Sequence, residues 1–271
     1  MRYVLRNAPP PLDRHIEAFW YWEGDPLDRL KDTILASAGM DLLVNLADDR
    51  LRWYDGPDFC TSRSVRGIGI AGPSSRAIAV DAFQRKMMGV KFRPGGAFPF
   101  FGTSISALAD QRISLVDLWG PDAGRLYERL ANAPAPNAKF DILIRALNTK
   151  AGDAPERHPA VSHALDIFTR RNRVSIAAVA AKMGLSQKKF INIFSEHVGF
   201  RPKLYMRMAR FQRVLSQIAQ AHDVDWGDMV ERGGYYDQSH FIHDFEAFSG
   251  LSPSVYLNRR GAHLQHVPIP N

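Results

Sequence analysis

Two stretches of the chain repeat one spacing of polar, aromatic and turn-forming residues. The first covers residues 186–207 and the second residues 237–258. A shift of 51 positions superposes seven identical residues: Gln187/Gln238, Phe190/Phe241, Ile191/Ile242, Phe194/Phe245, Gly199/Gly250, Pro202/Pro253 and Tyr205/Tyr256. Lysine, asparagine, serine and histidine stand just before the aromatic positions and between them. Such side chains form hydrogen bonds with base edges and phosphates, so the repeated chemistry favours recognition of nucleic acid.

Each copy carries the local signals of a helix followed by a second helix. Ser186 or Asp237 is a good N-cap, because its side-chain oxygen can accept an unpaired amide of the first turn. The two phenylalanines lie four residues apart and therefore share one buried helix face. The shared glycine suits a left-handed helix end, and the shared proline suits the first turn of the next helix.

A short helix is predicted before each copy. Residues 175–183 have apolar side chains at 176, 179, 180 and 183, and Gly184 then permits a tight turn. The second unit has a helix at 226–232 and a turn at 233–235. Each unit is thus a helix-turn-helix, whose second helix normally lies in the major groove of DNA. A helical bundle that binds no nucleic acid is the alternative, since phenylalanines four apart also build ordinary cores.

The segment between the units predicts one amphipathic helix over residues 203–221, with apolar residues at 204, 208, 211, 214, 215 and 218. Nineteen helical residues span roughly 28 Å. Successive major grooves on one face of a duplex lie about 34 Å apart. The connecting helix therefore has about the length that lets both units of one chain bind adjacent turns.

At these residues the sequence resembles the AraC/XylS family of bacterial transcriptional regulators. The resemblance covers Pro159 to Arg260, and its most specific part is Gly234-Tyr235, Asp237-Gln238-Ser239-His240-Phe241, Phe245 and Gly250-Leu-Ser-Pro-Ser-Val-Tyr256. It implies seven helices, two of them recognition helices, and control of transcription initiation. The partners that it implies are double-stranded DNA and RNA polymerase. The resemblance suggests an activator, and the sequence leaves repression open as the alternative.

The resemblance also assigns DNA contacts by position. It implies base contacts by Lys188, Ile191 and Asn192 in the first recognition helix, and by Gln238, Ser239, Ile242 and His243 in the second. The expected backbone contacts are Ser186, Lys189, Lys203, Arg207, His240 and Arg173. The two isoleucines depart from the polar residue often found there, and could either press on a thymine methyl group or be poor readers.

The charge distribution agrees with a DNA-binding carboxy-terminal part. Residues 1–156 hold 20 Lys and Arg against 19 Asp and Glu, a net of +1. Residues 157–271 hold 15 against 9, a net of +6, and eight of the nine histidines. A domain that neutralises phosphates is expected to show this excess. The chain has one cysteine, Cys60, which excludes an intrachain disulfide and is expected to be buried. Because the sequence shows no apolar run typical of a secretion signal or a membrane span, it favours a soluble, cytoplasmic protein.

The amino-terminal half predicts short strands broken by Gly, Pro and Asp. The candidates lie at 16–23, 41–46, 51–54, 65–71, 76–82 and 87–92, with 51–54 paired to 41–46 across the turn at 47–50. Helices are expected at 114–119, 121–132 and 139–150. We therefore predict an α+β protein. It has a β-barrel or cupin-like sensor or dimerisation domain with flanking helices (1–150), a linker (151–158) and an all-α domain of two helix-turn-helix units joined by a long helix (159–262).

This half also resembles the amino-terminal part of a subgroup of the same family, through His15-Ile-x-x-Phe-Trp-x-Trp, Val90-Lys-Phe-Arg-Pro-Gly-Gly and Leu115-x-x-Leu-Trp-Gly. The resemblance implies a cupin-like sensor or dimerisation module. A metal-using cupin needs several histidines, and only His15 precedes residue 157, so we expect no metal and no cofactor. A small-molecule effector could bind among Trp20, Trp22, Trp53, Arg93 and Phe98.

These observations predict a sequence-specific transcriptional regulator that is not an enzyme. A ligand or homodimerisation through the amino-terminal domain could modulate it. Two alternatives stay open at this point. The amino-terminal domain could recruit a protein partner with no small-molecule effector, or it could be an enzyme that the helical domain localises on DNA.

Overall fold

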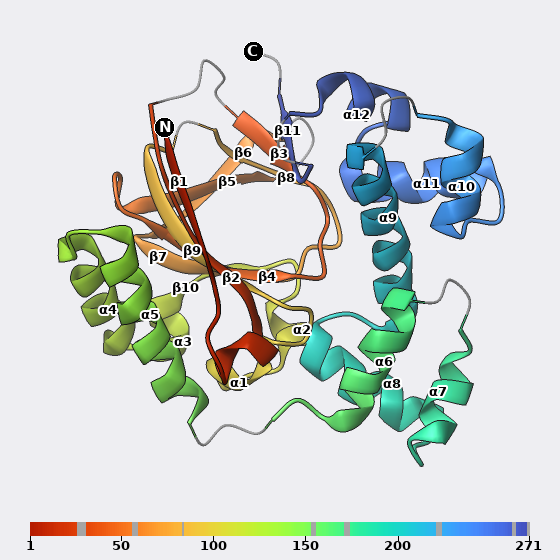
Figure 1. Cartoon of the computed structure of the whole chain (residues 1–271), viewed down its shortest axis with the longest axis horizontal. Coiled ribbons are helices and arrows are strands. Elements are labelled where there is room, and N and C mark those ends of the chain that lie inside the picture. Colours follow the sequence, from red (N-terminus) through yellow and green to blue (C-terminus); the bar gives the residue numbers. More distant parts are fainter. Residues whose placement is uncertain are drawn as a thin grey trace.

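The computed structural model describes residues 1–25, 31–55, 59–82, 84–152, 156–170, 174–220, 224–261 and 264–269. Its strands lie almost entirely in the amino-terminal half, and its long helices follow (Figure 1). The described strands form two antiparallel sheets beside a group of helices. The predicted α+β class is confirmed.

The larger sheet has six strands in the order β1-β2-β9-β4-β7-β10, which span Arg2–Asn7, Ile16–Glu23, Lys86–Phe92, Met40–Asn45, Ile68–Ala71 and Arg112–Ser114. Side chains alternate between its faces. Phe19 and Tyr21 of β2 therefore enter the core, while Trp20 and Trp22 lie on the opposite face. The strand expected over 65–71 is divided at Gly67, where φ of +60° ends one strand and starts the next.

The smaller sheet has five strands in the order β11-β3-β8-β5-β6, which span His266–Pro268, Lys31–Ile34, Ile78–Asp81, Arg50–Asp55 and Thr61–Arg66. Among the described strands the two sheets stay separate, so the β-rich part is not the closed barrel that the sequence suggested. Cys60, expected to be buried, is exposed just before β6.

The predicted hairpin between 41–46 and 51–54 is wrong. β4 lies between β9 and β7 in the larger sheet, whereas β5 lies between β8 and β6 in the smaller one. Both edges of β4 are already hydrogen-bonded, so β5 has no edge to join. The Asn45 side chain accepts the amides of Ala47 and Asp48, and the resulting turn leads the chain from one sheet to the other.

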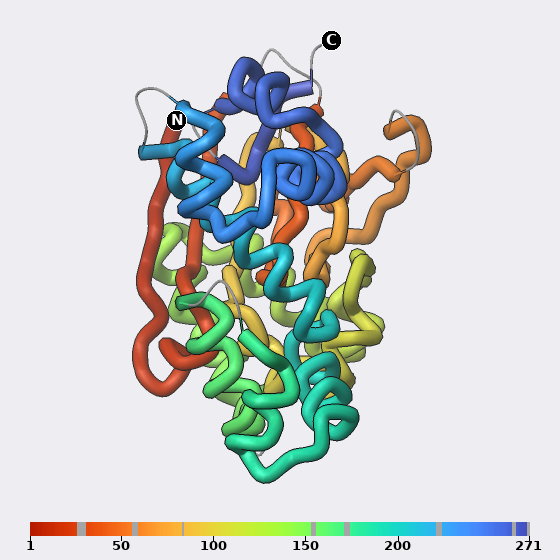
Figure 2. Tube along the Cα trace, turned by 90° about the vertical axis from the view of Figure 1, so that its right-hand side faces the viewer, coloured from red at the N-terminus to blue at the C-terminus, as the bar shows by residue number. Residues whose placement is uncertain are grey.

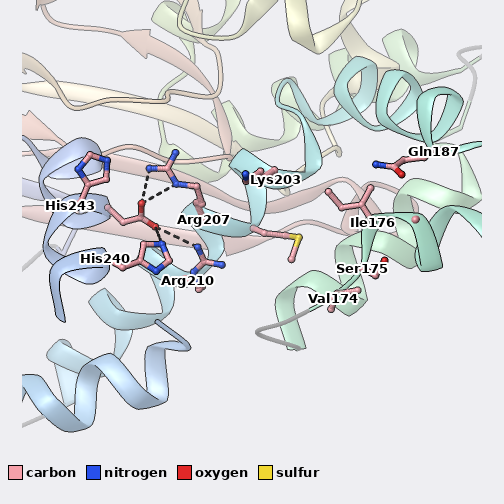
Figure 3. Close-up of a pocket in the computed structure, with 12 residues that line it drawn as sticks. Val174, Ser175, Ile176, Gln187, Lys203, Arg207, Arg210, His240 and His243 are labelled. Atoms are coloured by element: carbon pink, nitrogen blue, oxygen red, sulfur yellow. Dashed lines mark hydrogen bonds and ion pairs between the residues drawn. The ribbon is translucent and has the colours of Figure 1, made fainter. Parts of the chain in front are cut away.

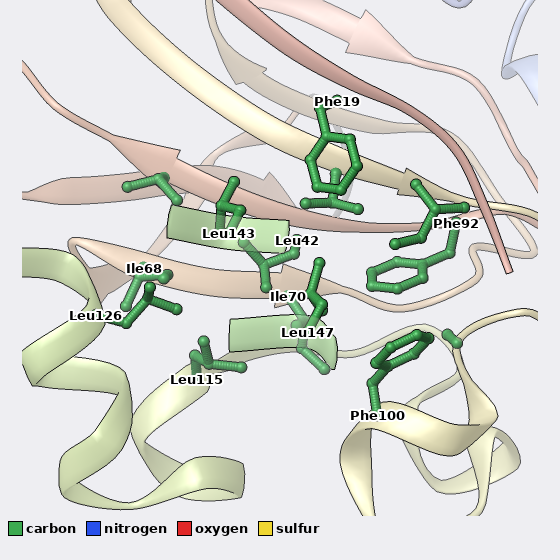
Figure 4. Close-up of a cluster of buried hydrophobic side chains, with 14 of the residues drawn as sticks. Phe19, Leu42, Ile68, Ile70, Phe92, Phe100, Leu115, Leu126, Leu143 and Leu147 are labelled. Carbon is green, nitrogen blue, oxygen red and sulfur yellow. The ribbon is translucent and has the colours of Figure 1, made fainter. Parts of the chain in front are cut away.

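Helices cover one face of the larger sheet and close its core (Figure 4). The 3₁₀ turn Leu12–Arg14 lies between β1 and β2. Helices α1 to α5 come after β9, with β10 between α2 and α3, and they span Phe98–Phe101, Ile105–Leu108, Leu115–Trp119, Pro121–Asn132 and Pro136–Ala151. Leu126 of α4 and Leu143 of α5 pack with Leu42 and Ile70 of the sheet. The helices predicted at 114–119, 121–132 and 139–150 are confirmed.

Seven further helices occupy the described carboxy-terminal part. Helices α6 to α12 span Pro159–Arg170, Ile176–Lys182, Gln187–Val198, Pro202–Gln220, Trp226–Gly233, Gln238–Ser249 and Pro253–Arg259. Helix α9 has 19 residues, as the sequence predicts, and carries α7–α8 at one end and α10–α11 at the other (Figure 2). Two helix-turn-helix pairs joined by one long helix are therefore present.

The β-rich part and the helices share a core, which the sequence did not reveal. Leu35 and Ala36, which follow β3, are fully buried among side chains of α9, α11 and α12. The Ala36 amide donates to the Phe248 carbonyl at 3.0 Å, and Gln212 donates to the Ala36 carbonyl at 2.6 Å. Strand β11 lies after the last helix and pairs with β3, so the chain returns to the smaller sheet beyond residue 262.

Candidate nucleic-acid interface

The amino-terminal ends of α8 and α11 are built alike. The Ser186 hydroxyl accepts the Lys189 amide at 3.3 Å, and the Asp237 carboxylate accepts the His240 amide at 2.7 Å. Phe190 and Phe194, like Phe241 and Phe245, are buried on the inner face of their helix, so the opposite face is turned outward. Both predicted N-caps are confirmed.

The predicted base-contact residues lie on these outward faces. Lys188 and Asn192 of α8 are exposed, as are Gln238, Ser239 and His243 of α11. Ile191 and Ile242 are half-buried, and Ile242 packs partly against the core of its unit.

A groove of about 1080 Å³ lies between the two units, with α9 along its length (Figure 3). Lys203, Arg207 and Arg210 of α9 line it in the middle. His240 and His243 of α11 line one end, and Ser175, Ile176 and Gln187 of the first unit line the other. Both helix-turn-helix units therefore open onto one cationic groove.

Asp244 of α11 is a buried carboxylate in the wall of this groove, with 1% of its surface exposed. Its Oδ1 accepts Arg207 Nε at 2.9 Å and an Arg207 terminal nitrogen at 2.6 Å. Its Oδ2 lies 3.5 Å from Arg210 and 3.7 Å from His240 (Figure 3). Burial raises the pKa of Tyr235, whose ring contacts Arg210, and the nearby Asp244 charge raises it further.

The predicted backbone-contact residues divide into two groups. Ser186, Lys189 and Lys203 are exposed and free to approach a phosphate. Arg207 and His240 are half-buried beside Asp244, so the charge of Arg207 is partly balanced inside the protein. Arg173 lies outside the described residues.

Sequence reasoning missed Arg210 and Asp244. Residues 203, 207 and 210 follow the four- and three-residue spacing of one helix face, so Arg210 could have been found from Lys203 and Arg207. Asp244 lies between two core-forming residues of the repeat, and no feature of the sequence marks it as the partner of residues 37 positions away.

The β-rich part contacts the carboxy-terminal ends of both α8 and α11. The ring of Phe98, in α1, lies 3.8 Å from that of His197 near the end of α8, and the Ser104 hydroxyl donates to the Glu196 carbonyl at 3.3 Å. The end of α11 is bound by Ala36 through the Phe248 carbonyl. The outward faces of α8 and α11 thus remain accessible while their carboxy-terminal ends are held.

Comparisons with known protein families decide the type of domain. A model described as a helix-turn-helix domain, of the AraC type, matches residues 179–259. The carboxy-terminal part of the chain is an AraC-type helix-turn-helix domain. This confirms the resemblance to the AraC/XylS family in the carboxy-terminal part of the chain, and a domain of this type supports DNA binding.

A second family model, a domain of unknown function (DUF6597), matches residues 6–114, ahead of the AraC-type domain. A comparison with curated proteins finds no match.

Several solved structures are similar to the chain. ToxT from Vibrio cholerae is 12% identical over 95% of this chain and 98% of its own, with a TM-score of 0.43. The C-terminal domain of AraT, a response regulator from Geobacillus stearothermophilus, is 18% identical over 40% of this chain and 92% of its own, with a TM-score of 0.37. A DNA-binding transcriptional dual regulator from Escherichia coli K-12 is 20% identical over 40% of this chain and 95% of its own, with a TM-score of 0.33.

The five residues considered for an effector do not lie together on one element. Trp20 and Trp22 lie on β2 of the larger sheet, and Trp53 lies on β5 of the smaller sheet. Arg93 donates from Nε to the Asp13 carbonyl at 3.0 Å, and Phe98 contacts His197 of the AraC-type domain. Arg93 and Phe98 therefore take part in contacts within the β-rich part and at its junction with α8.

The described residues also bear on whether the protein has a metal site or a membrane-spanning helix. In the described part of the chain, no group of three or more His, Cys, Asp or Glu side chains is arranged to hold a metal ion. The helices of that part include none that is long and apolar enough to cross a membrane.

Proposed function

We propose that the chain binds a specific DNA site as a monomeric reading unit, with α8 and α11 in successive major grooves of one duplex face. The single observation that carries this proposal is the shared groove, onto which the outward ends of both helices open. The 19 residues of α9 give a separation of roughly 28 Å, near the ~34 Å repeat of the duplex.

In this arrangement the two helices read base edges and the surrounding cations bind the backbone. Lys188, Ile191 and Asn192 read one half of the site; Gln238, Ser239, Ile242 and His243 read the other. Ser186, Lys189, Lys203, Arg207 and His240 bind phosphates, and Arg173 is proposed to do so from sequence alone. Exposure of Lys188, Asn192, Gln238, Ser239 and His243 supports base reading, and exposure of Ser186, Lys189 and Lys203 supports phosphate binding.

Selection of bound sequences from a random DNA pool tests the proposal. We expect an asymmetric site with two short conserved elements whose centres lie about one helical turn apart. Selection of no preferred sequence, or of a single element alone, would reject the two-groove arrangement.

Asn192→Ala is the sharpest test of base reading. An asparagine amide can form two hydrogen bonds with adenine, so its loss should relax preference at one position and weaken binding to the preferred site about tenfold or more. Binding to random DNA at low salt should hardly change. Affinities are measured by fluorescence anisotropy on both DNAs.

Lys189→Ala is the matched control on the same helix. An exposed cation that binds phosphate contributes equally to all sequences, so this variant should weaken both DNAs alike and reduce the salt slope by about one unit. Equal losses on both DNAs for Asn192→Ala would reject its assignment as a base reader.

We further propose that the DUF6597 region controls how the two units are presented, either by binding a small molecule or by homodimerisation, and that the regulator acts on RNA polymerase as an activator. Its contacts with the ends of both α8 and α11 support this role. Thermal-shift screening of the full chain against metabolite pools, with and without site DNA, tests the ligand. Light scattering of the full chain tests the dimer.

A further inference from the structure

Asp244 occupies the crossing of the second reading helix and the connecting helix. It is almost fully buried, and its Oδ1 receives both hydrogen bonds from Arg207 of α9. Its Oδ2 has no hydrogen-bond partner, although Arg210 and His240 lie within 3.7 Å. One carboxylate of α11 therefore links this helix to two arginines of α9, with His240 of the same helix beside it.

The two arginines are held on their other side as well. The Arg207 guanidinium lies 5.4 Å from the centre of the Phe248 ring, and that of Arg210 lies 5.4 Å from the centre of the Tyr235 ring. Each arginine is thus placed between Asp244 and an aromatic residue of the second unit. Guanidinium groups held in this way have few alternative positions.

This contact restricts the rotation of α11 about its own axis. A turn of the helix would withdraw Asp244 from Arg207 and leave a buried carboxylate without a partner, which is strongly unfavourable. The base-contact residues Gln238, Ser239 and His243 belong to the same rigid helix, so their direction is fixed with it.

We propose that Asp244 is the positioning residue of the second recognition helix: it does not contact DNA, but it sets the rotation at which α11 presents its base-contact residues. The inference rests on the proposed reading function of α11. By this role Asp244 strengthens specific DNA binding, although its negative charge by itself would weaken binding to DNA.

Charge alone predicts that removing this carboxylate strengthens binding to every DNA, because one negative group beside the phosphates is lost. A positioning role predicts weaker binding to the specific site instead. The sign of the change on specific DNA therefore separates the two.

Three variants of the full chain make the comparison. Asp244→Asn removes the negative charge and replaces one of the two carboxylate oxygens by an NH2 group, which cannot accept a hydrogen bond from an arginine. Arg207→Lys keeps the charge but loses the two-pronged geometry. Glu246→Gln is the control, since Glu246 is an exposed acidic residue on the same helix. Each variant is measured on the preferred site, on random DNA, and by selection from a random pool, after circular dichroism has verified its helix content.

We expect Asp244→Asn and Arg207→Lys to lose about tenfold affinity for the preferred site and to lose base preference in the half read by α11 only. The half read by α8 should keep its preference, which a general loss of folding would not allow. Glu246→Gln should keep both preferences and bind all DNA slightly more tightly.

Unchanged preference in both halves, or tighter binding of the preferred site by Asp244→Asn, overturns the inference. Loss of both halves together in Arg207→Lys also overturns it, since the role would then be one of general stability. If Asp244→Asn does not fold, the base preference of Arg207→Lys in each half of the site tests the positioning role instead. If the wild-type protein selects no preferred sequence, the proposed function itself is rejected. If the wild-type protein selects a two-element site and the variants select the same site, only the positioning role is rejected.

Discussion

At the scale of single residues, Ile191 and Ile242 show that the face proposed to read DNA also takes part in packing. Both occupy the position at which the resemblance to the AraC/XylS family leads us to expect a polar side chain, and both are half-buried. Ile242 contacts the core of the second unit. In the proposed complex, the buried part of such a side chain would hold its exposed part in place, where it would either contact a thymine methyl group or contribute little to base reading.

His197 leads to a prediction about pH. It is 6% exposed and lies against Phe98, and burial, assisted by the charges of His158 and Arg157, lowers its pKa to about 4. A histidine whose pKa is lowered in the folded state favours its neutral form. Its contribution to stability is therefore complete above the unfolded pKa of about 6.5 and is lost as the pH falls toward 4.

We expect the free energy of unfolding to fall by about 2–3 kcal/mol from this group between pH 6.5 and about 4. His197→Gln should remove that part of the pH dependence, and urea unfolding at several pH values measures it. An identical slope in wild type and variant would exclude His197 as the cause.

At the scale of elements, the glycines that end the helices have different surroundings. Gly184 and Gly199 both have positive φ, +66° and +95°. A Cβ at Gly184 would meet nothing within 4 Å, whereas a Cβ at Gly199 would lie 2.9 Å from Pro73 and 3.2 Å from Ile105. Gly199 therefore both ends α8 and lets the β-rich part approach it closely.

Gly184→Ala should cost about 1–2 kcal/mol, the strain of a left-handed non-glycine residue. Gly199→Ala should cost roughly 1–3 kcal/mol more, because it adds overpacking against the β-rich part. Chemical unfolding of both variants measures the difference. Equal costs would show that Pro73 and Ile105 move aside freely.

At the scale of the whole molecule, the two parts are not independent bodies. Leu35 and Ala36 belong to the core of the second helix-turn-helix unit, and β11 extends the smaller sheet from beyond that unit. The domain boundaries at 150 and 159 remain a proposal, and these contacts cross them.

Leu35→Ala tests this shared core. It should cost about 2–5 kcal/mol and lower the hydrogen-exchange protection of α9, α11 and α12. Leu42→Ala, in the core of the β-rich part, should cost a similar amount but lower protection mainly in the larger sheet and α5. The two patterns are compared by mass spectrometry on the full chain. Loss of protection in the same segments for both variants would show a single cooperative unit instead.

Local signals explain why the helical part was predictable. Ser186, Asp237, Gly199 and Gly250 act on their own turn of the backbone, and each has the predicted conformation or hydrogen bond. The outward position of Lys188 and Asn192 likewise follows from the phenylalanines of the same helix. Strand order could not be predicted in this way, because alternation fixes the face of a side chain but not the neighbour of a strand.

The sequence by itself determined the two helix-turn-helix units, their N-caps, the long helix between them and the excess of positive charge in this part of the chain. All of these features depend on residues that are close together in the sequence. Only the tertiary structure decided the separation of β4 from β5, the pairing of β11 with β3, the burial of Leu35 and the joining of Arg207 to Asp244. These contacts link residues from a few to more than two hundred positions apart in different elements, and packing chooses among partners that the local pattern leaves equivalent.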